Sequence, residues 1–69
     1  MKFILQALET ESDKMGYYSK DNPNGSNWTF ERSEATTFEE PIEAAQVLKS
    51  EIARWPELWE DMQPSIVSV

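Results

Sequence analysis

The chain of 69 residues contains neither cysteine nor histidine. Disulfide bonds and thiolate zinc sites, which stabilise many domains of this length, are therefore excluded, and histidine is missing as a metal ligand or general base. The chain must rely on a single hydrophobic core, and a chain this short buries only about 60% of the surface that its unfolded form exposes. Its 39% of hydrophobic residues, with three Trp, two Tyr and three Phe, suffice for one thin core. We therefore expect residues 1–69 to form one folded domain of modest stability.

Three segments in the first half of the chain have the residue pattern of β-strands. They are residues 2–8, residues 15–20 and residues 27–32. The last of them alternates most regularly, with Trp28 and Phe30 on one side, which predicts one packed and one solvated face. Between the second and third segments, residues 21–25 combine Pro, Asn and Gly in the pattern of a turn. This pattern predicts a hairpin loop of several residues.

A helix is predicted from Pro41 to Trp55. Proline suits the first helical turn, where its missing N–H would have no partner, and Pro56 disfavours helical geometry at the residue before it. Apolar residues at spacings of three and four predict one buried helix face. That face consists of Ile42, Ala45, Leu48, Ile52 and Trp55, widened by Ala44 and Val47.

The carboxy-terminal segment completes the predicted fold. Residues 56–62 are compatible with a short second helical turn that Pro64 ends, and residues 65–69 are apolar and β-branched, as expected of a strand. We expect this strand to pair beside the first one, whose Phe3-Ile4-Leu5 run is apolar on both faces. The predicted fold class is α+β, with an antiparallel sheet of about four strands and one helix packed on one face, in the order β-β-β-α-β.

Acidic residues dominate the charge of the chain. Thirteen Asp and Glu oppose six Lys and Arg, which gives a formal net charge of -7. This surplus favours a partner with a basic surface and opposes direct binding to the phosphate backbone of nucleic acids. Two interpretations stay open. The carboxylates form either a solvated surface that keeps a small protein soluble, or a face that resembles successive phosphates, because helical residues three or four apart lie about 5–6 Å from each other.

Position along the predicted helix separates the carboxylates into groups. The helix dipole favours negative charge at the helix start and disfavours it at the helix end. The group at the start, which needs no partner, is Glu39, Glu40 and Glu43. Beyond the end, aromatic residues accompany the acidic ones, and aromatic residues are frequent interface anchors, although core packing is the alternative explanation. The predicted partner-binding residues are Glu57, Glu60, Asp61, Glu51, Trp59 and Tyr17, with Tyr18 as the alternative to Tyr17.

No catalytic, metal or cofactor site is predicted. A glycosidase needs two carboxylates across a substantial cleft and a calcium loop needs alternating oxygen ligands around a glycine, and the chain offers neither pattern. The amino-terminal apolar run is too short for a signal peptide, and no segment approaches the roughly 20 apolar residues of a membrane span. We therefore expect a non-enzymatic, cytoplasmic protein that needs no cofactor and does not contact membranes.

The order and spacing of five segments resemble the layout of small β-hairpin–helix–strand proteins of phages and mobile elements. The segments are Gly16-Tyr17-Tyr18, Trp28-Thr29, Ala35-Thr36-Thr37-Phe38, Glu43-Ala44-Ala45 and Ile66-Val67-Ser68-Val69. Some of these proteins are anti-CRISPR proteins, which are acidic single-domain inhibitors that bind a Cas effector. The resemblance implies an inhibitor that blocks a host defence complex by occupying its DNA-binding surface. It assigns no functional residue to this chain.

Charge and resemblance together favour a non-enzymatic inhibitor that acts as a DNA mimic on the basic nucleic-acid-binding surface of a CRISPR-Cas effector. Two alternatives stay open. One is a small structural or assembly module that forms a homodimer through a sheet edge or face. The other is a protein that sequesters a small ligand such as a signalling nucleotide, which the net charge opposes because a phosphate site needs clustered Lys and Arg.

Overall fold

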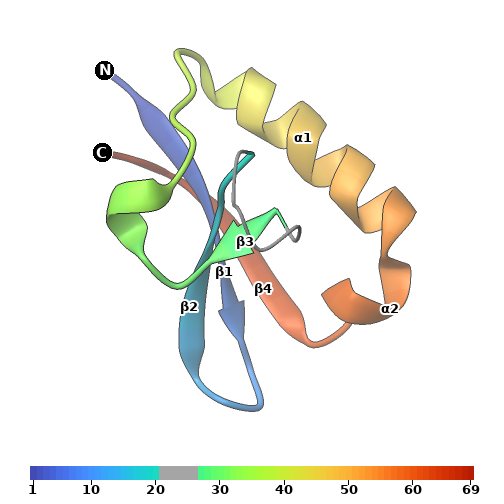
Figure 1. The fold of residues 1–69 in the computed structure, drawn as a ribbon. Coiled ribbons are helices and arrows are strands. Elements are labelled where there is room, and N and C mark those ends of the chain that lie inside the picture. Colours follow the sequence, from blue (N-terminus) through green and yellow to red (C-terminus); the bar gives the residue numbers. More distant parts are fainter. Residues whose placement is uncertain (21–26) are drawn as a thin grey trace.

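The computed structural model describes residues 1–20 and 27–69, and within these residues the chain forms one antiparallel sheet with strand order β3-β2-β1-β4 (Figure 1). The elements in chain order are β1 (Phe3–Glu9), β2 (Lys14–Tyr18), β3 (Trp28–Thr29), the 3₁₀ helix η1 (Arg32–Glu34), α1 (Pro41–Arg54), α2 (Pro56–Trp59) and β4 (Met62–Ser68). The predicted α+β fold class is confirmed, and so is the prediction that the last strand pairs beside the first.

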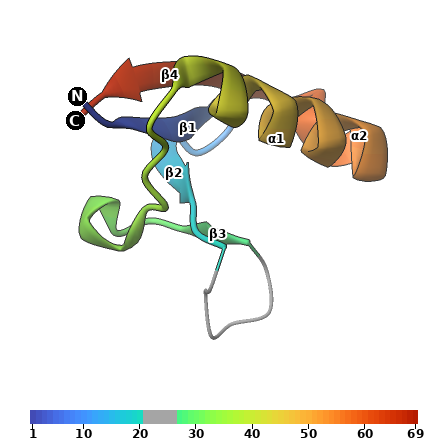
Figure 2. The same ribbon diagram turned by 90° about the horizontal axis from the view of Figure 1, so that it is seen from above.

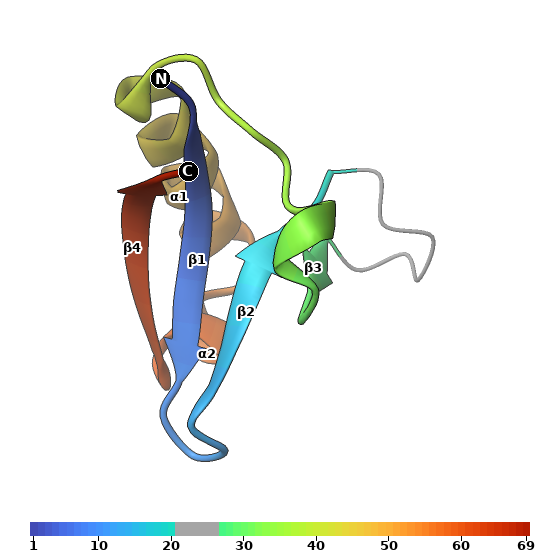
Figure 3. The same cartoon turned by 90° about the vertical axis from the view of Figure 1, so that its left-hand side faces the viewer.

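β1 is one of the two inner strands of the sheet and pairs with β2 and β4. Helix α1 covers one face of the sheet, while η1 lies over the opposite face near the end of β2 (Figures 2 and 3). The two chain ends lie side by side, because β1 and β4 run antiparallel and the Val69 N–H donates to the Lys2 carbonyl at 2.8 Å. At the same end, Phe3 and Phe38 exchange two backbone hydrogen bonds of 2.8 Å, which attach the segment before α1 to β1.

The core lies between β1, β2 and α1. Its buried residues are Leu5, Tyr18, Phe38 and Ala44, and the partly buried residues packed against them are Phe3, Trp28, Val47, Leu48 and Ile66. The Tyr18 ring stacks on Phe38 with 6.1 Å between ring centres and meets Trp28 edge-on at 6.2 Å. Such aromatic pairs contribute about 0.5–1.5 kcal/mol beyond their buried area. The core is therefore small and largely aromatic.

The buried face of α1 differs from the predicted one. The helix begins at Pro41, as predicted, and it buries Ala44 and Glu51 and partly buries Val47 and Leu48. Much of the predicted apolar face is exposed instead, namely Ile42, Ala45, Ile52 and Trp55. The small side chain of Ala44 lets the helix backbone approach the sheet, so packing against the sheet decides the rotation of the helix more than the count of apolar residues does.

The third strand is shorter than predicted. β3 contains only Trp28 and Thr29, which pair with Tyr18 and Tyr17, and the prediction of a strand over residues 27–32 with Phe30 on the packed face is wrong. Phe30 is 63% exposed, because the backbone turns into η1 directly after the strand. The predicted hairpin turn at residues 21–25 lies outside the described residues.

The fourth strand begins earlier than predicted, because Pro64 lies inside it rather than ending the preceding helical turn. In the antiparallel pairing with β1, the N–H groups of Val69 and of every second residue before it point toward β1. Pro64 falls on the alternate set, whose N–H groups point away from the sheet at its free edge. Proline is tolerated at that position because no ladder hydrogen bond is lost, and it also discourages another strand from adding to the edge.

A leucine in the core and a leucine on the surface test this description of the core. Leu5→Ala removes a side chain that is 0% exposed and should lower the free energy of unfolding by about 2–5 kcal/mol, which is a large part of the total for a domain of this size. Leu58→Ala makes the same chemical change at a side chain that is 53% exposed and should lower it by less than about 1 kcal/mol. Urea denaturation measures both, and equal losses would contradict the assignment of the core.

Candidate functional site

At the end of the sheet away from the chain termini, the β1–β2 turn lies beside α2 and the start of β4 (Figure 1). Side chains of these segments and of β3 line a groove there. Its larger part has a volume of about 290 Å³ and is mainly apolar, and it continues into a smaller part of about 240 Å³ with carboxylates around it. We call the two parts together the acidic groove. Its apolar side chains are Trp28, Phe30, Leu58 and Met62. Its carboxylates are Glu9, Glu11, Glu57 and Asp61.

Backbone hydrogen bonds hold the two acidic segments of the groove together. Both the N–H and the hydroxyl of Thr10 donate to the Asp61 carbonyl, at 3.0 and 2.9 Å. The β1–β2 turn itself is closed by the Asp13 N–H, which donates to the Glu9 carbonyl at 2.8 Å. Asp13 adopts a φ of 58°, a left-handed conformation that Asp tolerates better than most residues do. These bonds therefore fix the backbone around Asp61 relative to the β1–β2 turn that carries Glu11.

The apolar wall of the groove is supported from the core. The Trp28 ring contacts Trp59 with 5.0 Å between ring centres, and a Cβ atom at Gly16 would lie 3.6 Å from the Trp28 ring. The indole therefore lies over β2 at a distance where a methyl group at residue 16 would be in ordinary van der Waals contact with it. Phe30 and Leu58 stay more than half exposed, so the groove presents apolar surface to solvent.

The carboxylates of the acidic groove have no cationic partner within the described part of the chain. There, the one ion pair joins Lys2 to Glu39 at 3.4 Å, at the other end of the molecule, and both of its side chains are largely exposed. Lys14, the cross-strand neighbour of Glu9, forms no ion pair with it and has its ammonium 5.7 Å from the centre of the Phe30 ring. The Ser12 hydroxyl donates to one oxygen of Glu9 at 3.0 Å, which orients that carboxylate without neutralising it.

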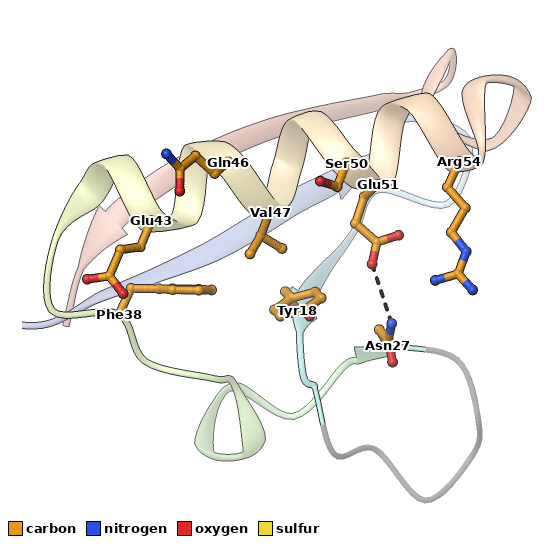
Figure 4. A pocket seen from close by; sticks show the side chains of 9 residues that line it. All are labelled: Tyr18, Asn27, Phe38, Glu43, Gln46, Val47, Ser50, Glu51 and Arg54. Atoms are coloured by element: carbon orange, nitrogen blue, oxygen red, sulfur yellow. Dashed lines mark hydrogen bonds between the residues drawn. The ribbon is translucent and has the colours of Figure 1, made fainter.

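A second concave site lies beneath α1 and has a volume of about 470 Å³ (Figure 4). We call it the α1 cleft. From the helix it is lined by Glu43, Gln46, Val47, Ser50, Glu51 and Arg54. From the opposite side it is lined by Tyr18, Asn27 and Phe38. Glu51 points across this cleft toward Asn27, whose side-chain amide donates to it at 3.5 Å (Figure 4).

The structure brings only part of the predicted partner-binding group together. Glu57 and Asp61 both line the acidic groove, whereas Glu60 follows α2 as an exposed residue that does not line the groove. Glu51, which was predicted to belong to the same acidic group, is only 7% exposed and faces the α1 cleft. The position of Glu51 on the inner face of α1 separates it from the others.

The two predicted aromatic anchors also lie away from the surface of the groove. Trp59 is 6% exposed and packs on Trp28, so it supports the groove from behind. Its indole N–H has no hydrogen-bond acceptor among the described residues. Tyr17 is half-buried and, as the neighbour of the buried Tyr18 in the same strand, points to the opposite face of the sheet.

Four residues of the groove were not predicted as site residues: Glu9, Glu11, Phe30 and Leu58. The strand pairing could have indicated Glu9 and Glu11. A final strand that pairs antiparallel with the first strand must begin beside the turn that follows the first strand. This brings Glu9 and Glu11 to Asp61. The exposure of Phe30 and Leu58 depends on where β3 and α2 end, and no pattern in the sequence indicates it.

The environment of Glu51 generates a prediction on stability. A buried carboxylate with one long hydrogen bond loses its hydration without full compensation, and Glu51→Gln removes that charge while keeping the shape of the side chain. The variant should unfold at a higher urea concentration, with a gain of up to about 1 kcal/mol. Glu40→Gln, at an exposed residue next to α1, should leave stability almost unchanged. A loss of stability in Glu51→Gln would show that the buried carboxylate stabilises the fold.

Within residues 1–20 and 27–69, no group of three or more acidic side chains is placed to hold a metal ion. None of the helices found there has the length and apolar character that crossing a bilayer requires. Comparisons with models of protein families, with curated proteins and with solved structures give no match to this chain. What the protein does is therefore inferred from the acidic groove and the α1 cleft.

Proposed function

We propose that the protein is a non-enzymatic inhibitor that binds a basic, nucleic-acid-binding surface of another protein through the acidic groove. The observation that carries this proposal is the juxtaposition of four carboxylates, without a cationic partner among the described residues, with an exposed apolar wall. A CRISPR-Cas effector of the host is the partner that the resemblance of the sequence suggests. In this role the carboxylates stand in for DNA phosphates.

Electrostatics supports a basic partner. With a net charge of -7, the acidic groups of the free protein repel one another. This repulsion is strongest where four carboxylates surround one groove. The Debye length is about 8 Å at physiological salt, so charges within one groove still interact, whereas charges at opposite ends of the molecule are largely screened. Lysine and arginine side chains of a partner would relieve the repulsion locally. Charge complementarity of this kind raises association rates and selects against acidic partners.

The apolar wall explains why a protein, and not a free polycation, fits the groove best. Affinity in protein interfaces comes mostly from a few aromatic and aliphatic anchors that become fully desolvated, with charges around them. Phe30 and Leu58 are exposed and able to bury an apolar side chain of a partner between them and Trp28. The partner surface that this geometry fits has an apolar side chain surrounded by Lys and Arg.

Charge reversal at the groove tests the proposal. The Glu57→Lys/Asp61→Lys variant should inhibit DNA binding by a purified Cas effector at least about tenfold more weakly than the original protein, because attractive contacts become repulsive. The control is Glu39→Lys/Glu40→Lys, which changes the net charge equally at exposed residues before α1 and should inhibit almost normally. The measurement is competition with a fluorescent DNA duplex. Equal weakening by both variants would exclude the groove as the contact, and absence of inhibition by the original protein on a panel of effectors would exclude the function.

Self-association is the second candidate, and the exposed side of α1 favours it. Ile42 is 64% exposed, and Ala45 and Ile52 are exposed on the same side of the helix. If two copies meet through these residues, sedimentation at about 100 µM should show a dimer that Ile42→Lys/Ile52→Lys converts to a monomer. A monomer at that concentration would exclude this candidate and leave the proposed function untouched.

A further inference from the structure

The α1 cleft shares no residue with the acidic groove, and the proposed function does not use it. Its main chemical feature is the carboxylate of Glu51. An ionised carboxylate has room for about four hydrogen bonds. Among the described residues, Glu51 accepts one, from Asn27, at the long distance of 3.5 Å, and its residue is 7% exposed. Its second oxygen accepts no hydrogen bond from the described residues, so a ligand that enters the cleft could donate to it.

Arg54, the cation that lines the cleft together with Glu51, does not pair with it. Arg54 lies one turn further along α1 and also lines the cleft, yet within the described residues it forms no ion pair with Glu51. Its guanidinium lies 5.9 Å from the centre of the Trp55 ring. Arg54 and Glu51 both extend from α1 toward the Asn27 side of the cleft (Figure 4), and within the described residues the carboxylate of Glu51 forms no ion pair.

The remaining walls of the cleft suit an organic cation on an alkyl or aromatic-stacking stem. Tyr18 and Phe38 present two stacked rings, with Val47 above them (Figure 4). Aromatic faces attract guanidinium and ammonium groups, and the methylene stems of such ligands pack on apolar side chains. Glu43 adds a second carboxylate at the other end of the cleft, so an anionic ligand such as a nucleotide would be repelled there.

We propose that the α1 cleft is a binding site for a guanidinium or alkylammonium group, with Glu51 as its anionic partner. The cation donates hydrogen bonds to the carboxylate of Glu51, and its stem lies along Tyr18 and Phe38. Two sources share this chemistry: a free amine such as a polyamine, or an arginine side chain of a partner protein. The site does not depend on the proposed function, because the two sites differ in every residue.

Titrations followed by ¹H–¹⁵N NMR test the site, with the side-chain amide of Asn27 and the backbone amide of Glu51 as reporters. Agmatine is the free cation, a blocked tripeptide with central arginine represents a protein side chain, and butylurea is a neutral isostere of the guanidinium. Agmatine or the peptide should give saturable shifts at these reporters below about 10 mM, a range that reveals even millimolar binding. Shifts with the peptide alone would identify a protein side chain as the source. Equal shifts with butylurea, or none with either cation, would overturn the proposal.

Matched variants separate a local effect of Glu51 from the overall charge of the protein. Glu51→Gln should weaken cation binding about 10- to 100-fold, the range expected for losing a hydrogen bond between charged groups. Glu40→Gln removes the same charge outside the cleft and should bind as the original protein does. Unchanged binding in Glu51→Gln, with a dispersed NMR spectrum showing that it is folded, would overturn the proposal. Inhibition of a Cas effector should persist in this variant, which distinguishes this site from the acidic groove.

Discussion

Strand β1 is the constraint on which the rest of the structure depends. It pairs with β2 on one side and with β4 on the other, and it contributes Leu5 and Ala7, both 0% exposed, to the face under α1. The same strand buries Ile4 on the opposite face. The chain has no disulfide bonds, so burial of both faces of this strand takes the stabilising role that disulfides have in many small domains. At one end of β1, Phe3 pairs with Phe38 and so attaches the segment before α1 to the sheet. At the other end, Glu9 lines the acidic groove.

A core this small cannot enclose all the apolar side chains of the chain. Those of Phe30, Ile42, Trp55 and Leu58 are more than half exposed. Two of them, Phe30 and Leu58, lie next to carboxylates in the acidic groove, which explains how an acidic protein can offer both charge and apolar contact at one place. The α1 cleft has a related origin, because the helix face that packs on the sheet at Ala44 also carries Glu51 and brings its carboxylate into the cleft.

Much of the fold could be predicted from the sequence, because local rules and packing agree there. The apolar run of β1, the start of α1 at proline and the bend before Pro56 are local signals, and they were predicted correctly. Pro64 shows where local rules fail: its effect depends on which way its nitrogen faces in the sheet, and that direction follows from pairing with β1. The rotation of α1 likewise depends on the sheet that it meets.

The candidate site could be predicted only in part for the same reason. Glu57 and Asp61 are close in sequence, and their position near a helix end singled them out. Glu51 belongs to the same stretch of sequence, but the helix turns it inward, and Trp59 is turned inward by α2. The partners of Asp61 in the groove come from the β1–β2 turn, about fifty residues away in the chain, so only the strand pairing brings them together.

The central claim is that the acidic groove contacts basic residues of a partner. Zero-length carbodiimide cross-linking of the inhibitor–effector complex tests it most directly, because the reagent joins only carboxylates and amines in contact. The account predicts cross-links from Glu57 and Asp61, with Glu9 or Glu11, to lysines of the nucleic-acid-binding surface of the effector. Cross-links confined to carboxylates outside the groove, such as Glu39 and Glu40, would contradict it.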